Sequence, residues 1–166
     1  HALKAPKIPP TGSGQQLNFG VHRIQVERDH LLWVSDAEER AEEHLQIESE
    51  GEFSGVGHQW RVYRSSVEKA LQQRDKHKAI LDAVKSPWPW TVRSWRKGDR
   101  FCPVGMKGSK LLSDYFIDRK FTQLQKEDMR VLTIGGEIAW LMGERVDARF
   151  AADARSEKVY VIEPMQ

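Results

Sequence analysis

The chain has 166 residues, of which 39% are hydrophobic and 30% are charged, a composition that is ordinary for a globular protein with its own hydrophobic core. No apolar run approaches the roughly 18 residues that a membrane span requires, and the single cysteine, Cys102, excludes an internal disulfide framework. We therefore expect a cytoplasmic protein with no membrane segment. Because the first residue is His1 and not Met, we also expect an excerpt of a longer protein.

The net charge of +2 is unevenly distributed along the chain. Residues 1–84 carry 11 Lys and Arg against 13 Asp and Glu, whereas residues 85–149 carry 13 against 8, and the remainder carries 2 against 3. The cationic surplus therefore lies in the second half, where it favours a polyanionic partner.

The first half divides into a leader and a β-rich segment. Residues 1–14 combine three prolines with a Thr-Gly-Ser-Gly run, which is typical of a flexible leader. Alternating and apolar runs in 15–84 predict a β-rich subdomain that joins the chain to an upstream part, with short strands at 22–26, 31–34, 45–47, 52–54 and 59–63. The acidic stretch Ser35–His44 fits a capped helix or an exposed loop. Ser65–Val84 predicts a polar helical or irregular connection followed by a strand near 79–83.

A Pro-rich run at residues 86–89 marks the best internal boundary, so we predict a second domain over 85–166. Its expected elements are a strand at 91–95, a turn at 97–99, a helix at about 110–119 with Ser109 as N-cap, a hairpin of 131–134 and 137–142 around Gly135-Gly136, and an edge strand at 158–162. The fold class is α+β: strand-dominated, with a mixed or antiparallel sheet and one or two short helices.

Basic side chains concentrate around the predicted turn, loop and helix. Arginine grips phosphate bidentately, glycine lets the backbone approach closely, and a helix N-terminus favours anions. The alternative is that these are ordinary solvated charges, some of them paired with Asp99, Asp114, Asp118 and Asp147. The candidate phosphate-binding residues are Arg93, Arg96, Lys97, Arg100, Lys107, Lys110, Arg119, Lys120, Arg145 and Arg149.

Enzyme signatures are missing from this sequence. Gly105 and Gly108 lie too close together for a phosphate-binding loop, and the six histidines precede the basic segment without a metal-ligand spacing. We expect no catalytic residue, metal site or cofactor site in the chain. The tryptophans are expected to be packed; only Trp88 and Trp90 are candidates for exposure, and even there packing is favoured.

Three runs of residues carry a family resemblance. They are R-S-W-R-x-G-D-R-F at Arg93–Phe101, P-V-G-M-K-G-S-K-x-L-S-D-x-F-I-D-R-K at Pro103–Lys120 and G-E-I-x-W-x-x-G-x-R-V-D-x-R-F at Gly136–Phe150. In order and spacing, over roughly 70 residues, they resemble the C-terminal domain of the bacterial tRNA(Ile)-lysidine synthetases.

The resemblance implies a non-catalytic fragment of a ligase for tRNA modification. Members use ATP, with Mg, in an N-terminal domain to join lysine to an anticodon cytidine, and the C-terminal domain holds the tRNA by its acceptor stem. The expected partners are tRNA and the upstream domains of the same enzyme. The competing hypothesis is a protein-interaction module that docks on the parent enzyme or forms a homodimer through an exposed strand edge.

Overall fold

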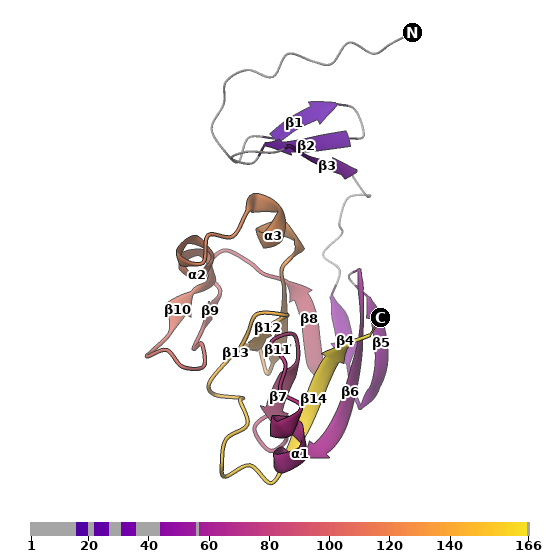
Figure 1. Ribbon diagram of the computed structural model, residues 1–166, viewed down its shortest axis with the longest axis vertical. Coiled ribbons are helices and arrows are strands. Elements are labelled where there is room, and N and C mark those ends of the chain that lie inside the picture. The colour runs from indigo at the N-terminus through magenta and orange to yellow at the C-terminus, as the bar shows by residue number, and fades with distance from the viewer. Residues whose placement is uncertain (1–15, 20–21, 27–30, 36–43, 56, 166) are drawn as a thin grey trace. The chain divides into compact units, whose positions relative to one another are not determined.

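The computed structural model describes residues 44–55 and 57–165, together with the backbone of 16–19, 22–26 and 31–35 (Figure 1). The chain divides into two compact units, one made of residues 1–41 and 121–127 and the other of 42–120 and 128–166. The predicted leader, most of the acidic stretch and the side chain of Trp33 lie outside the described residues. No helix in the described parts of the chain is long and apolar enough to cross a bilayer.

The first unit contains a three-stranded antiparallel sheet. Strands β1 (Gln16–Phe19), β2 (His22–Val26) and β3 (Leu31–Ser35) pair in sequence order, which confirms the hairpin predicted from 22–26 and 31–34. Helix α3 (Gln123–Asp128) begins with a reciprocal cap: the Thr122 hydroxyl accepts from the Gln125 N–H at 3.1 Å, and the Gln125 side-chain oxygen accepts from the Thr122 N–H at 2.8 Å.

The second unit contains two larger antiparallel sheets. The five-stranded sheet has the order β13 (Arg145–Val146), β12 (Glu137–Leu141), β11 (Arg130–Ile134), β8 (Trp90–Ser94), β4 (Leu45–Ile47). The four-stranded sheet has the order β5 (Gly51–Gly55), β6 (His58–Ser66), β14 (Lys158–Pro164), β7 (Ala79–Asp82). The strands predicted in 45–63 and at 79–83, and the hairpin around Gly135-Gly136, are confirmed.

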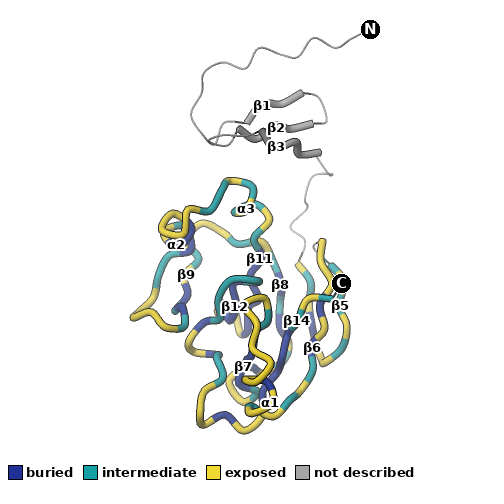
Figure 2. The backbone as a smooth tube through the Cα atoms, in the orientation of Figure 1, coloured by how far each residue is buried: buried dark blue, intermediate teal, exposed yellow. Residues whose placement is uncertain are grey.

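One hydrophobic core joins the two sheets. Trp90 and Trp140 from the five-stranded sheet pack in the same buried cluster as Trp60 and Tyr160 from the four-stranded sheet. Figure 2 shows the strands around this core as the most buried segments. The predicted boundary between residues 84 and 85 lies inside this unit, because β4 pairs with β8 and β7 pairs with β14.

The prediction of an edge strand at 158–162 is wrong, because β14 lies between β6 and β7. Both of its faces are covered: Tyr160 and Ile162 face the shared core, while Val159 and Val161 pack with Ala70 of helix α1 (Val67–Gln72). A run of four buried apolar residues is therefore the signature of an interior strand here.

The helix predicted at about 110–119 is α2 (Leu112–Asp118), and Ser109 does not cap it. Lys110 and Leu111 instead form strand β10, which pairs with strand β9 (Arg100–Phe101). The Ser109 hydroxyl accepts a hydrogen bond from Arg100 Nε at 3.0 Å. The first helical N–H, from Leu112, bonds to the carbonyl of Asp99 at 2.9 Å.

Candidate nucleic-acid interface

The basic turn after β8 is organised by one carboxylate. Asp99 accepts two parallel hydrogen bonds from Arg93, at 2.9 and 3.0 Å, and a third from the backbone N–H of Arg96 at 2.7 Å. The Asp99 N–H closes the turn onto the Arg96 carbonyl, and Gly98 takes the positive φ of 93° that the turn requires. Arg93 is therefore occupied in holding the turn, and the turn presents exposed Lys97.

Asp99 gives the domain an acid-sensitive contact. Burial alone would raise the pKa of Asp99, but the hydrogen bonds from Arg93 and from the Arg96 backbone outweigh burial and lower it. A carboxylate with a depressed folded-state pKa stabilises the fold above its unfolded pKa of about 3.9 and loses that contribution as the pH falls through the folded value. We expect the free energy of unfolding to decrease as the pH is lowered below about 4, and to decrease less steeply in Asp99→Asn.

Urea denaturation between about pH 2.5 and 6 measures this slope. Arg93→Gln should reduce the slope in the same way, because it removes the donor that lowers the pKa of Asp99. Equal slopes in the wild-type protein and both variants would contradict this assignment.

The connection between β9 and β10 forms an exposed loop. Gly105 and Gly108 have positive φ values of 81° and 74°, and exposed Met106 and Lys107 lie between them. Arg100 fixes the far end of the loop by donating to the hydroxyl and the carbonyl of Ser109, at 3.0 and 3.3 Å. In Figure 1 this hairpin lies beside α2. The loop therefore presents Lys107 on a short, tethered backbone segment.

Asp147 ties the start of that loop to the segment after β13. Its fully buried carboxylate accepts from the backbone N–H of Cys102 at 2.7 Å and from the backbone and guanidinium of Arg149 at 2.8 to 3.0 Å. Arg149 also donates to Glu137 at 2.8 Å, and these bonds, first the one to Asp147, raise the pKa of Arg149. Asp99 and Asp147 are thus confirmed as ion-pair partners of arginine.

Three more of the predicted cations hold local structure. Lys110, which precedes α2, pairs with Asp118, the last residue of that helix, and Arg119 lies 3.8 Å from a carboxylate oxygen of Glu144. Arg145 donates to the carbonyl of Val104 at 3.0 Å, so it supports the β9–β10 loop from outside.

The remaining lysines are differently placed. Lys97, Lys107 and Lys120 are exposed, and none of them forms an ion pair with any residue in the described ranges. They are the members of the predicted set whose charge is best placed to meet an external anion. Exposed ion pairs are weak, so Lys110 and Arg119 can also exchange their partners for phosphate.

The tryptophans whose side chains the structure describes pack within the domain and do not form a stacking surface. Trp88 stacks on Trp90 with ring centroids 3.9 Å apart, Trp90 is fully buried, and Trp95 packs edge-on against Phe116 at 4.9 Å. The expectation that Trp60, Trp90 and Trp140 are packed is confirmed.

Comparison with known proteins shows which family the basic segment resembles. Residues 90–163 match the family model described as the TilS substrate C-terminal domain. Over these residues the chain is similar to TilS C-terminal domains. The resemblance predicted from the Arg93–Phe101, Pro103–Lys120 and Gly136–Phe150 motifs is confirmed. The matched residues begin at β8 and end within β14, and they include both Asp99 and Asp147.

Relatives extend the similarity over most of the chain. This chain is 34% identical over 155 residues to a tRNA(Ile)-lysidine synthase of Parabacteroides distasonis, a match that covers 90% of the chain and 34% of the relative. Over 88 residues it is 47% identical to the synthase of Bacteroides thetaiotaomicron, covering 53% and 21%. The chain therefore spans about a third or less of these curated relatives. A crystal structure of a TilS C-terminal domain has the same fold, with a TM-score of 0.60 at 19% identity, covering 74% of this chain and 97% of that one.

Proposed function

We propose that this chain is the tRNA-holding, non-catalytic part of a tRNA(Ile)-lysidine synthase. The family match over residues 90–163 carries the proposal. The placement of Lys97, Lys107 and Lys120 supports it, because all three are exposed and without an ion pair among the described residues. We assign the adenylation of the tRNA by ATP and Mg²⁺ to the other domains of a cytoplasmic synthase. No step of that reaction is placed in this chain.

Phosphate contacts are the physical basis of the proposed binding. The narrow major groove of A-form RNA hides its base edges, so proteins hold an RNA duplex mainly through phosphates and 2′-hydroxyls. Lysines on a tight turn and on a short tethered loop suit this task, because they bring compact charges to fixed points of a rigid backbone. The partly buried pair of Asp99 with Arg93 and the pair of buried Asp147 with Arg149 set those points.

The double variant Lys97→Gln/Lys107→Gln tests this assignment. We expect about tenfold weaker binding of tRNA(Ile), and a log–log salt slope that is shallower by roughly 1.5, because each lost phosphate contact removes about 0.7 to 0.9. Filter binding over a salt series measures both quantities. The control Lys69→Gln/Lys158→Gln removes the same charge from exposed positions outside this set and should change neither. Equal effects of the two double variants would refute the assignment.

The alternative role, docking on the parent enzyme or forming a homodimer, predicts a different result. Light scattering of the chain would show a mass that rises with concentration, while its affinity for tRNA would be negligible at every salt concentration.

A further inference from the structure

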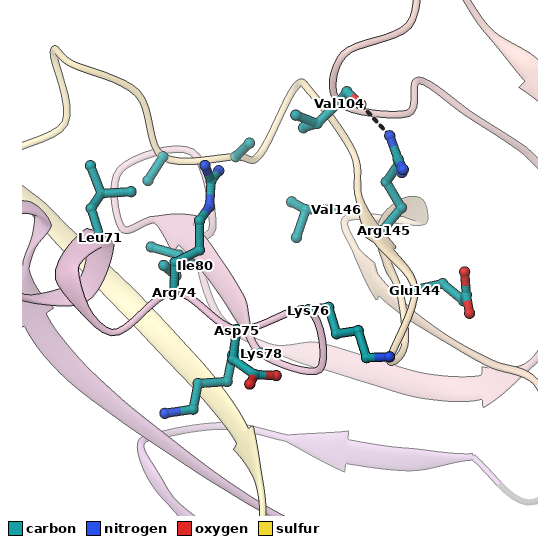
Figure 3. A pocket seen from close by; sticks show the side chains of 12 residues that line it. Leu71, Arg74, Asp75, Lys76, Lys78, Ile80, Val104, Glu144, Arg145 and Val146 are labelled. Carbon is teal, nitrogen blue, oxygen red and sulfur yellow. Dashed lines mark hydrogen bonds between the residues drawn. The ribbon is translucent and has the colours of Figure 1, made fainter.

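A pocket of about 430 Å³ lies in the second unit, between the α1–β7 connection and β13 (Figure 3). Binding pockets for small ligands occupy about 300 to 1,000 Å³, so this one has room for a single nucleotide. Arg145 is one of the predicted phosphate-binding residues, whereas the lining residues of the α1–β7 connection are not. Its charged lining consists of Arg74, Asp75, Lys76, Lys78, Glu144 and Arg145.

The charges in this lining are not balanced by one another. Lys78 pairs with Glu163, 3.0 Å away, and Glu144 lies near Arg119. Arg74 and Lys76 are exposed and form no ion pair with any residue that the structure describes. Asp75, between these two cations, accepts a hydrogen bond from the backbone N–H of His77 at 2.8 Å. The lining as a whole carries four cations against two carboxylates, Asp75 and Glu144, which favours an anionic ligand.

The rest of the lining is apolar. Leu71 is 40% exposed although it is a large aliphatic residue, and buried Ile80 and half-buried Val146 also line the pocket. In Figure 3 the side chains of Arg74 and Arg145 lie on either side of Val146. An inorganic anion would use only the cations. A ligand with a flat apolar face and a negative group would use both parts of the lining.

The pocket borders the candidate RNA-binding loop. Val104, in the connection between β9 and β10, lines it, and the Val104 carbonyl accepts the hydrogen bond from Arg145 at 3.0 Å. Lys107 belongs to the same connection. A nucleic-acid strand held at this loop can therefore continue into the pocket without leaving the domain.

We propose that the pocket binds one unpaired nucleotide of the bound RNA, with its phosphate held by the exposed cations Arg74 and Lys76 and its base against Leu71 and Val146. This inference rests on the proposed function and adds a second contact to it. Bases in a duplex are stacked and cannot enter such a pocket, whereas a nucleotide next to a duplex end can turn into it. Arg74 supplies a planar fork for phosphate, and Lys76 supplies a point charge.

Two RNA hairpins with the same stem test the proposal. One ends blunt and the other carries a four-nucleotide 3′ overhang, and the 166-residue chain is titrated with each. We expect the hairpin with the overhang to bind about tenfold more tightly, which is the effect of about one hydrogen bond to a charged group. Arg74→Gln/Lys76→Gln should abolish this advantage while leaving affinity for the blunt hairpin unchanged. Leu71→Asp, at an exposed position, should do the same.

Lys97→Gln/Lys107→Gln is the reciprocal control, and it should weaken both hairpins by the same factor. Equal affinities of the wild-type chain for the two hairpins would overturn the pocket proposal and leave the proposed function intact. An overhang advantage that survives Arg74→Gln/Lys76→Gln would also overturn it. Binding of neither hairpin would refute the proposed function, and the pocket proposal with it.

Discussion

Asp147→Asn should destabilise the second unit by about 3 kcal/mol. Both carboxylate oxygens of Asp147 accept hydrogen bonds: one from the backbone of Cys102, and both from Arg149. An asparagine in the same rotamer would turn an NH₂ group toward one set of these donors. The amide would then face a donor at a site with no exposure to water, which leaves buried polar groups unsatisfied.

Urea denaturation at neutral pH measures this loss. Glu137→Gln is the matched control, because Glu137 is the other carboxylate bound to Arg149 but is 61% exposed. It should cost no more than about 0.5 kcal/mol. If Asp147→Asn unfolded at the same urea concentration as Glu137→Gln, the central role of this carboxylate in holding the loop would be wrong.

Trp90→Ala should cost about 4 kcal/mol, the largest single effect we expect. The fully buried indole stacks on Trp88 and meets Tyr160 of the other sheet edge-on at 5.2 Å, and its N–H bonds to the Ser86 carbonyl at 3.2 Å. Its removal opens a cavity between the two sheets. Trp90→Phe keeps most of the ring volume and should cost less than about 2 kcal/mol.

Thermal unfolding followed by both near- and far-ultraviolet circular dichroism checks this prediction. Because the core spans both sheets, the two signals should shift together. Val84→Ser, at a position 91% exposed, is the control and should lie within about 0.5 kcal/mol of the wild-type protein. Separate transitions for the two signals would contradict a shared core.

Local patterns predicted much of the fold. The alternation in 59–63 and the glycine pair at 135–136 determine strands and a hairpin that depend on neighbouring residues alone. The place of β14 could not be read in this way, because it depends on pairing with β6 and β7, far away in the sequence. Helix α3 carried a readable signal that the sequence analysis did not use, the Thr122 and Gln125 capping box.

The candidate site was predictable as a set of charges and not as a geometry. Sequence spacing cannot distinguish Arg93, which donates two hydrogen bonds to Asp99, from Lys97, which is exposed on the same turn. Ser109 illustrates the same limit, since a hydroxyl before a helix can serve the helix or a neighbouring strand, and here it serves Arg100. Several motif residues therefore act by fixing the backbone, and a few exposed lysines between them form no ion pair with the described residues.

The salt dependence of tRNA binding tests the central claim most directly. Affinity of the 166-residue chain for tRNA(Ile) would be measured between about 50 and 200 mM salt. Each phosphate contact releases counterions, so the number of contacts determines how steeply the affinity depends on salt. With Lys97, Lys107 and Lys120 engaged, the logarithm of the association constant should fall linearly with the logarithm of salt, with a slope of about −2 or steeper. An affinity that does not change over this range, or no binding at the lowest salt, would contradict the account.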